Sequence, residues 1–147
     1  MKISTKGRYG LRVMIELALR HGEGPVMMDT ISTCLGVSRK YLYTLLTVLK
    51  NAGLVRAIRG ARGGFCLHQQ PSDITVLDVI EVLEGELSPV GCQDADGKSC
   101  ERIDRCAARD IWRDLAETIR ESLSRLTLAE LAERQRGKQP VAPMYFI

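Results

Sequence analysis

The sequence has no apolar run that approaches the roughly 20 residues needed to cross a bilayer. Its first ten residues, MKISTKGRYG, also lack the apolar stretch of a secretion signal. We therefore expect a cytoplasmic protein with no membrane partner, in a compartment where thiols stay reduced. The five cysteines, an odd number, then favour metal binding or redox chemistry over a structural disulfide framework.

Motifs of catalysis are missing as well. The sequence shows no paired carboxylates in a glycine-lined pocket, no nucleophile motif and no phosphate-binding loop, so we do not expect an enzyme.

Positive charge is concentrated in the first half of the sequence. Residues 1–75 carry 11 Lys/Arg against 4 Asp/Glu, a net charge of +7, whereas residues 76–147 carry 10 against 14, a net charge of −4. A basic half of this kind indicates a nucleic-acid binder, and an electron carrier would not need it.

Residues 28–51 contain two short helical patterns that meet at Leu35-Gly36-Val37-Ser38. Gly36 can adopt the left-handed backbone that ends a helix, and Ser38 can cap the next one. One face of the second pattern is apolar, with Leu42, Leu45, Leu46 and Leu49 at three- and four-residue spacing. Its other face carries Lys40, Tyr43, Thr44, Thr47 and Asn51. This arrangement predicts a helix-turn-helix whose second helix enters a major groove, with a plain helical hairpin as the alternative.

Two short apolar segments follow, at 54–58 and 65–68, and read as strands. The segment between them, residues 59–64, contains three glycines together with Arg59 and Arg62. Glycine lets backbone approach DNA closely, and an arginine at such a tip can enter a narrow minor groove. Behind a helix-turn-helix this predicts a wing, although an ordinary flexible turn has the same composition.

The first helix is expected over residues 6–19, with Lys6, Arg8 and Arg12 near its start. Cations are unfavourable at a helix N-terminus, so their placement suggests a bound anion such as backbone phosphate. A solvated surface is the alternative explanation for each of them.

The second half begins with a short helix through residues 76–83, opened by a capping box of Thr75 and Asp78. Residues 86–105 have no periodicity and form a loop. A long helix is predicted over residues 107–126, and Thr127 with Glu130 caps a final short one. The long helix exceeds what a core of this size needs, so we infer that it packs on a second copy of the chain. Its apolar stripe consists of Ile111, Trp112, Leu115, Ile119, Leu123 and Leu126.

Three cysteines lie in or beside the loop: Cys92, Cys100 and Cys106, separated by seven and five residues. This spacing matches neither the paired CxxC of structural zinc nor a ferredoxin run. The thiolates could hold an iron–sulfur cluster, bind zinc with a fourth ligand, or form a reversible disulfide. The remaining two, Cys34 and Cys66, have apolar neighbours and are predicted to be small core residues.

Three segments resemble one bacterial family of winged-helix regulators, the family that includes the iron–sulfur regulator IscR and the nitric-oxide sensor NsrR. They are ISTKGRYGLRVMIELAL, SRKYLYTLLTVLKNAGLVRAIRGARGGF and IWRDLAETIRESLSRLTLAEL, and the resemblance covers about residues 2–134. It implies a homodimer that binds a partly palindromic operator in double-stranded DNA. It also implies a 2Fe–2S or 4Fe–4S cluster on Cys92, Cys100 and Cys106, with DNA-reading positions at Ser38, Lys40, Tyr43 and Thr44 and a minor-groove contact at Arg59.

The chain departs from this family pattern at the fourth cluster ligand. The histidine of IscR corresponds to Arg109, and the aspartate of NsrR corresponds to the neighbourhood of Arg8 and Tyr9. The remaining candidates are Asp94, Asp96, Glu101, Asp104, a water, a small thiol or no ligand. Such a cluster is expected to be labile and to be lost during purification. Tyr43 also stands where IscR-like proteins often carry glutamate, so the operator is expected to differ from that of IscR.

Together these observations predict a mainly α protein with a small β-hairpin wing, built as a winged helix-turn-helix plus a long dimerisation helix. The expected divisions are a DNA-binding domain over residues 1–85, a cysteine loop over 86–106, dimerisation and short C-terminal helices over 107–136, and a tail over 137–147. The alternative is a cluster-free regulator that uses the same cysteines as a thiol–disulfide switch or zinc site. The candidate DNA-binding residues are Lys6, Arg8, Ser38, Arg39, Lys40, Tyr41, Tyr43, Thr44, Thr47, Arg59 and Arg62.

Overall fold

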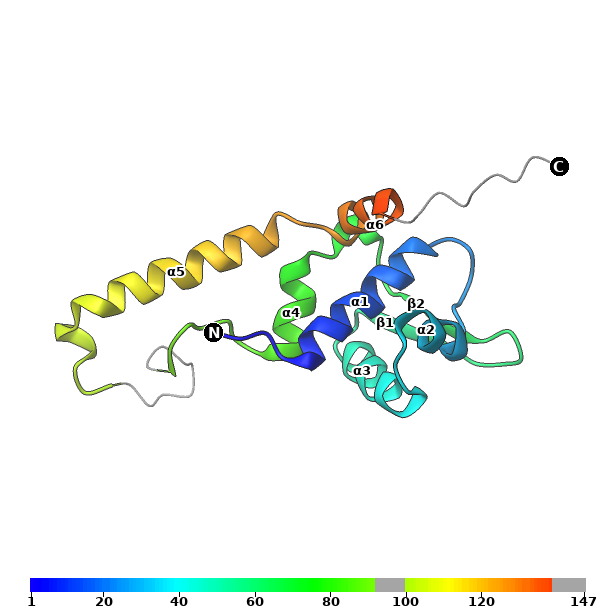
Figure 1. Ribbon diagram of the computed structural model, residues 1–147, viewed down its shortest axis with the longest axis horizontal. Coiled ribbons are helices and arrows are strands. Elements are labelled where there is room, and N and C mark those ends of the chain that lie inside the picture. The colour runs from blue at the N-terminus through cyan, green and yellow to red at the C-terminus, as the bar shows by residue number, and fades with distance from the viewer. Residues whose placement is uncertain (92–99, 139–147) are drawn as a thin grey trace.

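The computed structural model describes residues 1–91 and 100–138, and it is mainly helical with one two-stranded antiparallel sheet (Figure 1). The predicted fold class, a helical protein with a β-hairpin wing, is thereby confirmed. Two 3-10 turns, Pro71–Asp73 and Ile103–Arg105, were not predicted. The elements are α1 (Thr5–Leu19), α2 (Met28–Leu35), α3 (Arg39–Asn51), β1 (Val55–Ile58), β2 (Gly64–Leu67), α4 (Val76–Glu84), α5 (Ala107–Ser124) and α6 (Leu128–Lys138).

The main core lies where α1 crosses α3, α4 and α6. Val13 and Met14 of α1 are fully buried, and they share one apolar cluster with Leu45 of α3, Val79 of α4 and Leu128 of α6. The spacing of the apolar residues in each helix explains this packing, because positions three and four apart fall on one side. The body that carries the helix-turn-helix is therefore held by helices from both ends of the chain.

Helix α6 returns to the body through short backbone contacts. Thr75 and Thr127 pair in an antiparallel bridge, the Val76 N–H donates to the Leu126 carbonyl at 2.8 Å, and the Leu128 N–H donates to the Ile74 carbonyl at 2.9 Å. Both adjoining helix starts carry the predicted caps: the Thr75 N–H donates to the Asp78 carboxylate at 2.8 Å, and the Thr127 N–H donates to the Glu130 carboxylate at 2.8 Å.

Helix α5 projects from this body (Figure 1), and none of its residues is buried. Its C-terminal part packs on α4 in a second, smaller apolar cluster that contains Val76, Ile80, Ile119 and Leu123. Arg120 of α5 also forms an ion pair with Glu81 of α4. Nothing comparable holds the N-terminal part of α5 within the described residues. Throughout these residues, moreover, no helix combines the length and apolar character that a bilayer crossing requires.

Candidate nucleic-acid interface

The turn between α2 and α3 has the geometry expected of a helix-turn-helix. Gly36 ends α2 in the left-handed region, with φ of 64° and ψ of 33°. The Ser32 hydroxyl donates to the Val37 carbonyl at 2.6 Å and fixes the turn. Ser38 then caps α3, because its hydroxyl oxygen accepts from the Tyr41 N–H at 3.2 Å. The roles predicted for Gly36 and Ser38 are confirmed, whereas the Ser32 bond was not predicted.

Helix α3 buries one face and exposes the other. The four leucines of its apolar stripe are at most 1% exposed, and they fix the helix against the core: Leu42, Leu45, Leu46 and Leu49. On the outer face Lys40 and Thr44 are exposed, and the Tyr43 side chain is 62% exposed. Buried leucines orient this outer face, so the hydrogen-bonding side chains are presented on a rigid element.

Two threonines of this face are already partly satisfied within the helix. The Thr44 hydroxyl donates to the Lys40 carbonyl at 3.2 Å, and the Thr47 hydroxyl donates to the Tyr43 carbonyl at 2.7 Å. A hydroxyl that donates its proton in this way keeps its oxygen lone pairs free to accept. These threonines are therefore suited to accept hydrogen bonds from base amino groups, whereas Lys40 and Tyr43 can donate.

Two other predicted DNA-binding residues of α3 make contacts inside the protein. Arg39 pairs with Asp29 of α2 at 3.1 Å, in an exposed ion pair of the kind that contributes little to stability. Tyr41 is half-buried and packs edge-on against Tyr9 of α1, with ring centroids 6.1 Å apart and an interplanar angle of 86°. The guanidinium of Arg12 lies 5.1 Å from the centre of the Tyr9 ring. This cluster joins the start of the second helix of the motif to α1.

The N-terminus of α1 carries the other predicted contacts. Ser4 caps the helix by accepting from the Gly7 N–H at 3.1 Å, and its own hydroxyl donates to Glu84 of α4. Arg8 is exposed and donates to the Thr5 hydroxyl at 3.3 Å, while Lys6 is half-buried. Capping by Ser4 holds the helix start in place, and Arg8 is accessible to an anion such as backbone phosphate.

The predicted wing is present. Strands β1 and β2 pair antiparallel from Val55 opposite Leu67 to Ile58 opposite Gly64. At the tip the Gly63 N–H donates to the Gly60 carbonyl at 3.0 Å. A Cβ at position 63 would lie 2.2 Å from the Ile58 carbonyl oxygen, so only glycine fits this tight turn. The result is a narrow tip that projects Arg59 and Arg62 into solvent.

Few cations of the basic half are neutralised by the protein itself. Residues 1–75 contain 11 Lys/Arg, and within the described part of the chain only Arg20 and Arg39 of these form ion pairs. Lys40, Arg59 and Arg62 have no carboxylate within ion-pair distance among those residues. Unpaired cations on the second helix and on the wing form a surface that attracts a polyanion.

The cysteine segment is partly described. Cys92 lies outside the described residues, as do Asp94 and Asp96. Cys100 and Cys106 are exposed, with the 3-10 turn between them, and neither forms a disulfide with another described cysteine. Cys106 is the N-cap residue of α5, and its side chain makes no capping bond. In the part of the chain that the structure describes, no three His, Cys, Asp or Glu side chains converge as metal ligands would.

Comparison with known proteins identifies the family. The model of the Rrf2 family, described as iron-dependent transcriptional regulators, matches residues 3–134. The chain belongs to the Rrf2 family. It is 44% identical over 147 residues to the HTH-type transcriptional regulator CymR of Bacillus subtilis, with 100% of both chains covered.

Solved structures agree with this assignment. The Rrf2-family chain matches the structure of CymR from B. subtilis with a TM-score of 0.77 and 45% identity, over 91% of this chain and 98% of that one. IscR from T. potens gives a TM-score of 0.77 and 37% identity, over 99% of this chain and 97% of the other. The protein is therefore a DNA-binding transcriptional regulator, as the sequence predicted. Its relatives are regulators and not enzymes.

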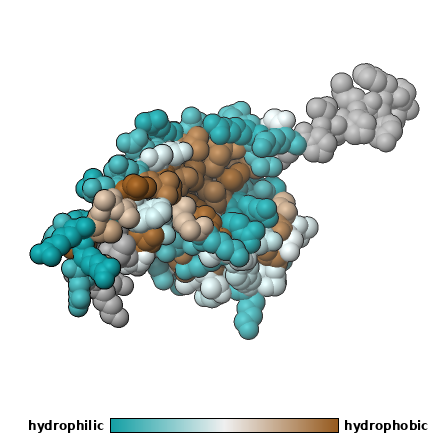
Figure 2. Space-filling model, turned by 60° about the vertical axis from the view of Figure 1, so that its left-hand side comes forward, coloured by the Kyte–Doolittle hydropathy of each residue, from teal (hydrophilic) through white to brown (hydrophobic). Residues whose placement is uncertain are grey.

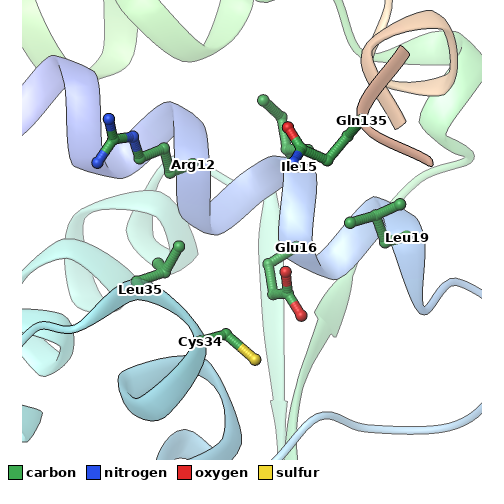
Figure 3. A pocket seen from close by; sticks show the side chains of 7 residues that line it. All are labelled: Arg12, Ile15, Glu16, Leu19, Cys34, Leu35 and Gln135. Atoms are coloured by element: carbon green, nitrogen blue, oxygen red, sulfur yellow. The ribbon is translucent and has the colours of Figure 1, made fainter. Parts of the chain in front are cut away.

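The prediction that Cys34 and Cys66 are core residues of this Rrf2-family protein is wrong. Cys34 is exposed, and its side chain extends into a hollow of about 370 Å³ lined by α1, α2 and Gln135 of α6 (Figure 3). Arg20 lies 3.6 Å from its sulfur, and a hydrogen bond from Arg20 to Glu16 raises the pKa of that guanidinium. Cys66 is half-buried, and its sulfur accepts from Arg56 Nε at 3.1 Å. Both thiols therefore have an arginine neighbour that comes from a different part of the sequence.

Proposed function

We propose that this Rrf2-family protein is a homodimer that reads a partly palindromic operator, with a cluster on Cys92, Cys100 and Cys106 controlling its affinity. The observation that carries the DNA-reading part is the unpaired positive charge on the outer face of α3 and at the wing tip. The residues that we propose to contact DNA also include neighbours of this charge on α1 and α3: Lys6, Arg8, Ser38, Arg39, Lys40, Tyr41, Tyr43, Thr44, Thr47, Arg59 and Arg62.

Each part of this surface has a separate role. Helix α3 enters the major groove, where Lys40 and Tyr43 donate to base edges or phosphates and Thr44 accepts. Arg59 at the wing tip enters the adjacent minor groove. The free N–H groups in the first turn of α3, beside the Ser38 cap, face a phosphate. Base contacts determine the sequence that is bound, while phosphate contacts set the position of the protein on the duplex.

The dimer is supported by the unpartnered face of α5. Ile111 is 63% exposed, Leu115 42% and Trp112 36%, and all three lie along one side of the helix. Figure 2, which brings the α5 side of the molecule forward, shows apolar side chains gathered in one area bordered by hydrophilic ones. Exposed aromatic and aliphatic side chains in one stripe are typical of a helix that packs on a second copy. Two half-sites would then be read by two α3 helices.

The two described cysteines suit a thiolate-bound cluster. Cys100 and Cys106 are exposed soft donors, and Cys106 stands at the N-terminus of an 18-residue helix. Cysteine sulfurs are the usual protein ligands of iron–sulfur clusters. A bound cluster would supply a redox- and nitric-oxide-sensitive link among the three thiolates. These residues would hold it directly before α5, so its loss would change the restraint on the dimerisation helix.

Arg109 occupies the position where IscR carries its histidine ligand, and it has another role here. Its guanidinium donates to the Ile103 carbonyl at 3.2 Å and lies 4.0 Å from the Asp104 carboxylate. A guanidinium stays protonated and cannot ligate a metal. It instead ties the 3-10 turn between the two cysteines to the first turn of α5. Cluster binding through three thiolates, with Glu101, Asp104 or a small molecule as fourth donor, is the arrangement that we propose.

The DNA-reading and dimer proposals can be tested together. Selection from a random duplex library should yield a partly palindromic site whose half-site centres are about 34 Å apart. Leu115→Lys should convert the dimer to monomers in sedimentation and weaken binding to the full site. Glu117→Lys, which places the same side chain on the opposite side of α5, should change neither. A wild-type monomer, or selected sites without symmetry, would contradict the proposal.

The cluster proposal has its own test. Protein purified without oxygen should be brown and contain iron and sulfide. Replacement of Cys92, Cys100 or Cys106 by serine should abolish the colour, whereas Cys34→Ser, at another exposed thiol, should keep it. Operator affinity should differ between the iron-loaded and iron-free wild type. Equal affinity of the two forms would contradict cluster control even if the cluster is present.

Similarity to CymR supports a second candidate function. CymR is described as the global cysteine regulator of B. subtilis, and it is 44% identical to this chain over its full length. The same three thiols could then form a reversible disulfide or hold zinc, with DNA binding unchanged in kind. Colourless protein from anaerobic purification, with either zinc or a disulfide that a reductant removes, would favour this function over the cluster.

A further inference from the structure

A second hollow lies beside the wing, away from the cysteine segment and from the outer face of α3. Its volume is about 310 Å³, which is within the range of small-molecule pockets. The end of α1, the α1–α2 connection and both wing strands line it. Gly22 and Gly24 of the connection contribute backbone only, so no side chain from them fills the space.

The floor of this hollow is apolar. Leu17, Val26 and Leu67 line it, and each is at most 7% exposed because its other side packs in the core. Ile58 of β1 lies at the same hollow and is 40% exposed. An apolar group seated here would cover mainly Ile58, because the floor residues are already nearly buried. Such burial is favourable at roughly 25 cal/mol per Å².

The rim of the hollow carries two arginines, Arg20 and Arg56, and none of the lining residues that the structure describes is acidic. His21 also lines it, and its Nε2 lies 3.2 Å from the Gln70 side-chain oxygen. Arg20 is already held by Glu16 at 2.8 Å. Arg56, in contrast, donates through Nε to the Cys66 sulfur at 3.1 Å and has no carboxylate partner among the described residues. The two terminal nitrogens of Arg56 can therefore bind an anion in a bidentate manner.

We propose that this hollow binds a small monocarboxylate with a short apolar tail. The tail lies on Leu17, Val26 and Leu67, and the carboxylate pairs with Arg56 near His21. A neutral molecule would make no ion pair with Arg56, and a phosphate would leave Ile58 exposed to water. The ligand bridges the wing and the α1–α2 connection and adds negative charge beside β1. It therefore acts as an effector that weakens operator binding, a role beyond the proposed function.

Calorimetry and amide NMR on the full chain, without DNA, test the site. Octanoate is the probe, and octan-1-ol and inorganic phosphate are its two controls. Octanoate should shift amides at 22–26, 56–58 and 65–67 and bind more tightly than either control. Arg56→Gln should lower the affinity for octanoate about five- to tenfold, which is the effect of losing a charge-assisted hydrogen bond partly exposed to water. Arg59→Gln removes the same charge from the same wing outside the hollow and should change binding by less than twofold.

Several results would overturn the site. The first is that octan-1-ol or phosphate binds as tightly as octanoate. The second is that Arg56→Gln and Arg59→Gln lose the same amount of octanoate affinity. The third is that octanoate shifts amides outside 22–26, 56–58 and 65–67. The comparison of the three probes uses wild-type protein, so it decides the question even if Arg56→Gln fails to fold. Octanoate should also lower the affinity of the wild type for its selected duplex severalfold. An unchanged affinity for that duplex would overturn the effector role. The titration with octanoate contains no DNA, so its outcome does not depend on the proposed function.

Discussion

Ser38 allows the stability of α3 and its contact with DNA to be separated by two substitutions. Its hydroxyl oxygen accepts from the Tyr41 N–H at 3.2 Å and is the side-chain cap of the helix. Ser38→Ala removes this bond. Ser38→Asp keeps an acceptor at the same place and adds a negative charge, which the helix dipole favours. We therefore expect Ser38→Ala to lose stability and keep operator binding. We expect Ser38→Asp to keep its stability and bind the operator weakly.

The magnitudes follow from the geometry of the cap. Loss of a serine N-cap costs about 1 kcal/mol of unfolding free energy, and this exposed bond belongs at or below that value. Ser38→Asp should unfold within a few tenths of a kcal/mol of the wild type. On DNA the added carboxylate faces the phosphate proposed at the start of α3. One phosphate contact per subunit is then lost, and the slope of log K against log salt should decrease by about 1.8 for the dimer.

The assay pairs urea unfolding, followed by circular dichroism, with titration of the selected duplex at several salt concentrations. The expected pattern is a destabilised Ser38→Ala that still binds, and a stable Ser38→Asp that binds weakly with a shallower salt slope. If Ser38→Asp bound the duplex as tightly as the wild type, the N-terminus of α3 would not face a phosphate. The docking of α3 proposed above would then be refuted.

Three further predictions concern other parts of the chain. Arg59→Gln should reduce the salt slope of operator binding by about 1.8 for the dimer, whereas Arg125→Gln in the acidic half should leave it unchanged. Hydrogen bonds from Thr127 lower the pKa of Glu130. The ionised Glu130 therefore stabilises the folded protein fully above the ordinary glutamate pKa, and this contribution is lost as the pH falls through the lowered pKa. Thermal melts should thus show Glu130→Gln less stable than the wild type at pH 7, with the difference vanishing in acid. Glu81→Ala, which removes the ion pair with α5, should weaken binding to a full duplex site more than binding to a half-site; equal weakening of both would contradict the role of this pair.

Much of the DNA-reading half could be predicted because its signals are local. Gly36, Ser38 and the leucines of α3 lie within a few residues of the features they determine, and the structure confirms the turn, the cap and the buried stripe. The wing was predicted for the same reason, since glycine and arginine between two apolar segments specify a hairpin tip. The DNA contacts themselves stay predictions, because they depend on a partner outside the chain.

The surroundings of the two isolated cysteines were not predicted, because their arginine neighbours lie on other elements, 14 residues away for Cys34 and 10 residues away for Cys66. Apolar neighbours in the sequence suggested burial for Cys34, yet this residue faces the space between two helices, where Arg20 approaches it. Cys66 lies on β2 opposite Arg56 of β1, and the Arg56 side chain donates to its sulfur. The docking of α6 was missed as well: Leu128 and Ala132 enter the core against α1, more than a hundred residues earlier. No local pattern specifies that partner.

The way α5 is attached explains how a change at the cysteines could reach DNA. Its C-terminal end is fixed to the body by the Arg120–Glu81 pair and by the backbone bond from Val76 to Leu126. Its 18 residues give a lever about 27 Å long, with Cys106 at the opposite end. A tilt of about 10° at the fixed end would displace the Cys106 end of α5 by roughly 5 Å relative to the body that carries α3. In a dimer joined along α5, such a tilt would also move the two α3 helices relative to each other. Hydrogen bonds to bases fail beyond about 3.5 Å, so a relative shift larger than this would prevent both half-sites from being read at once.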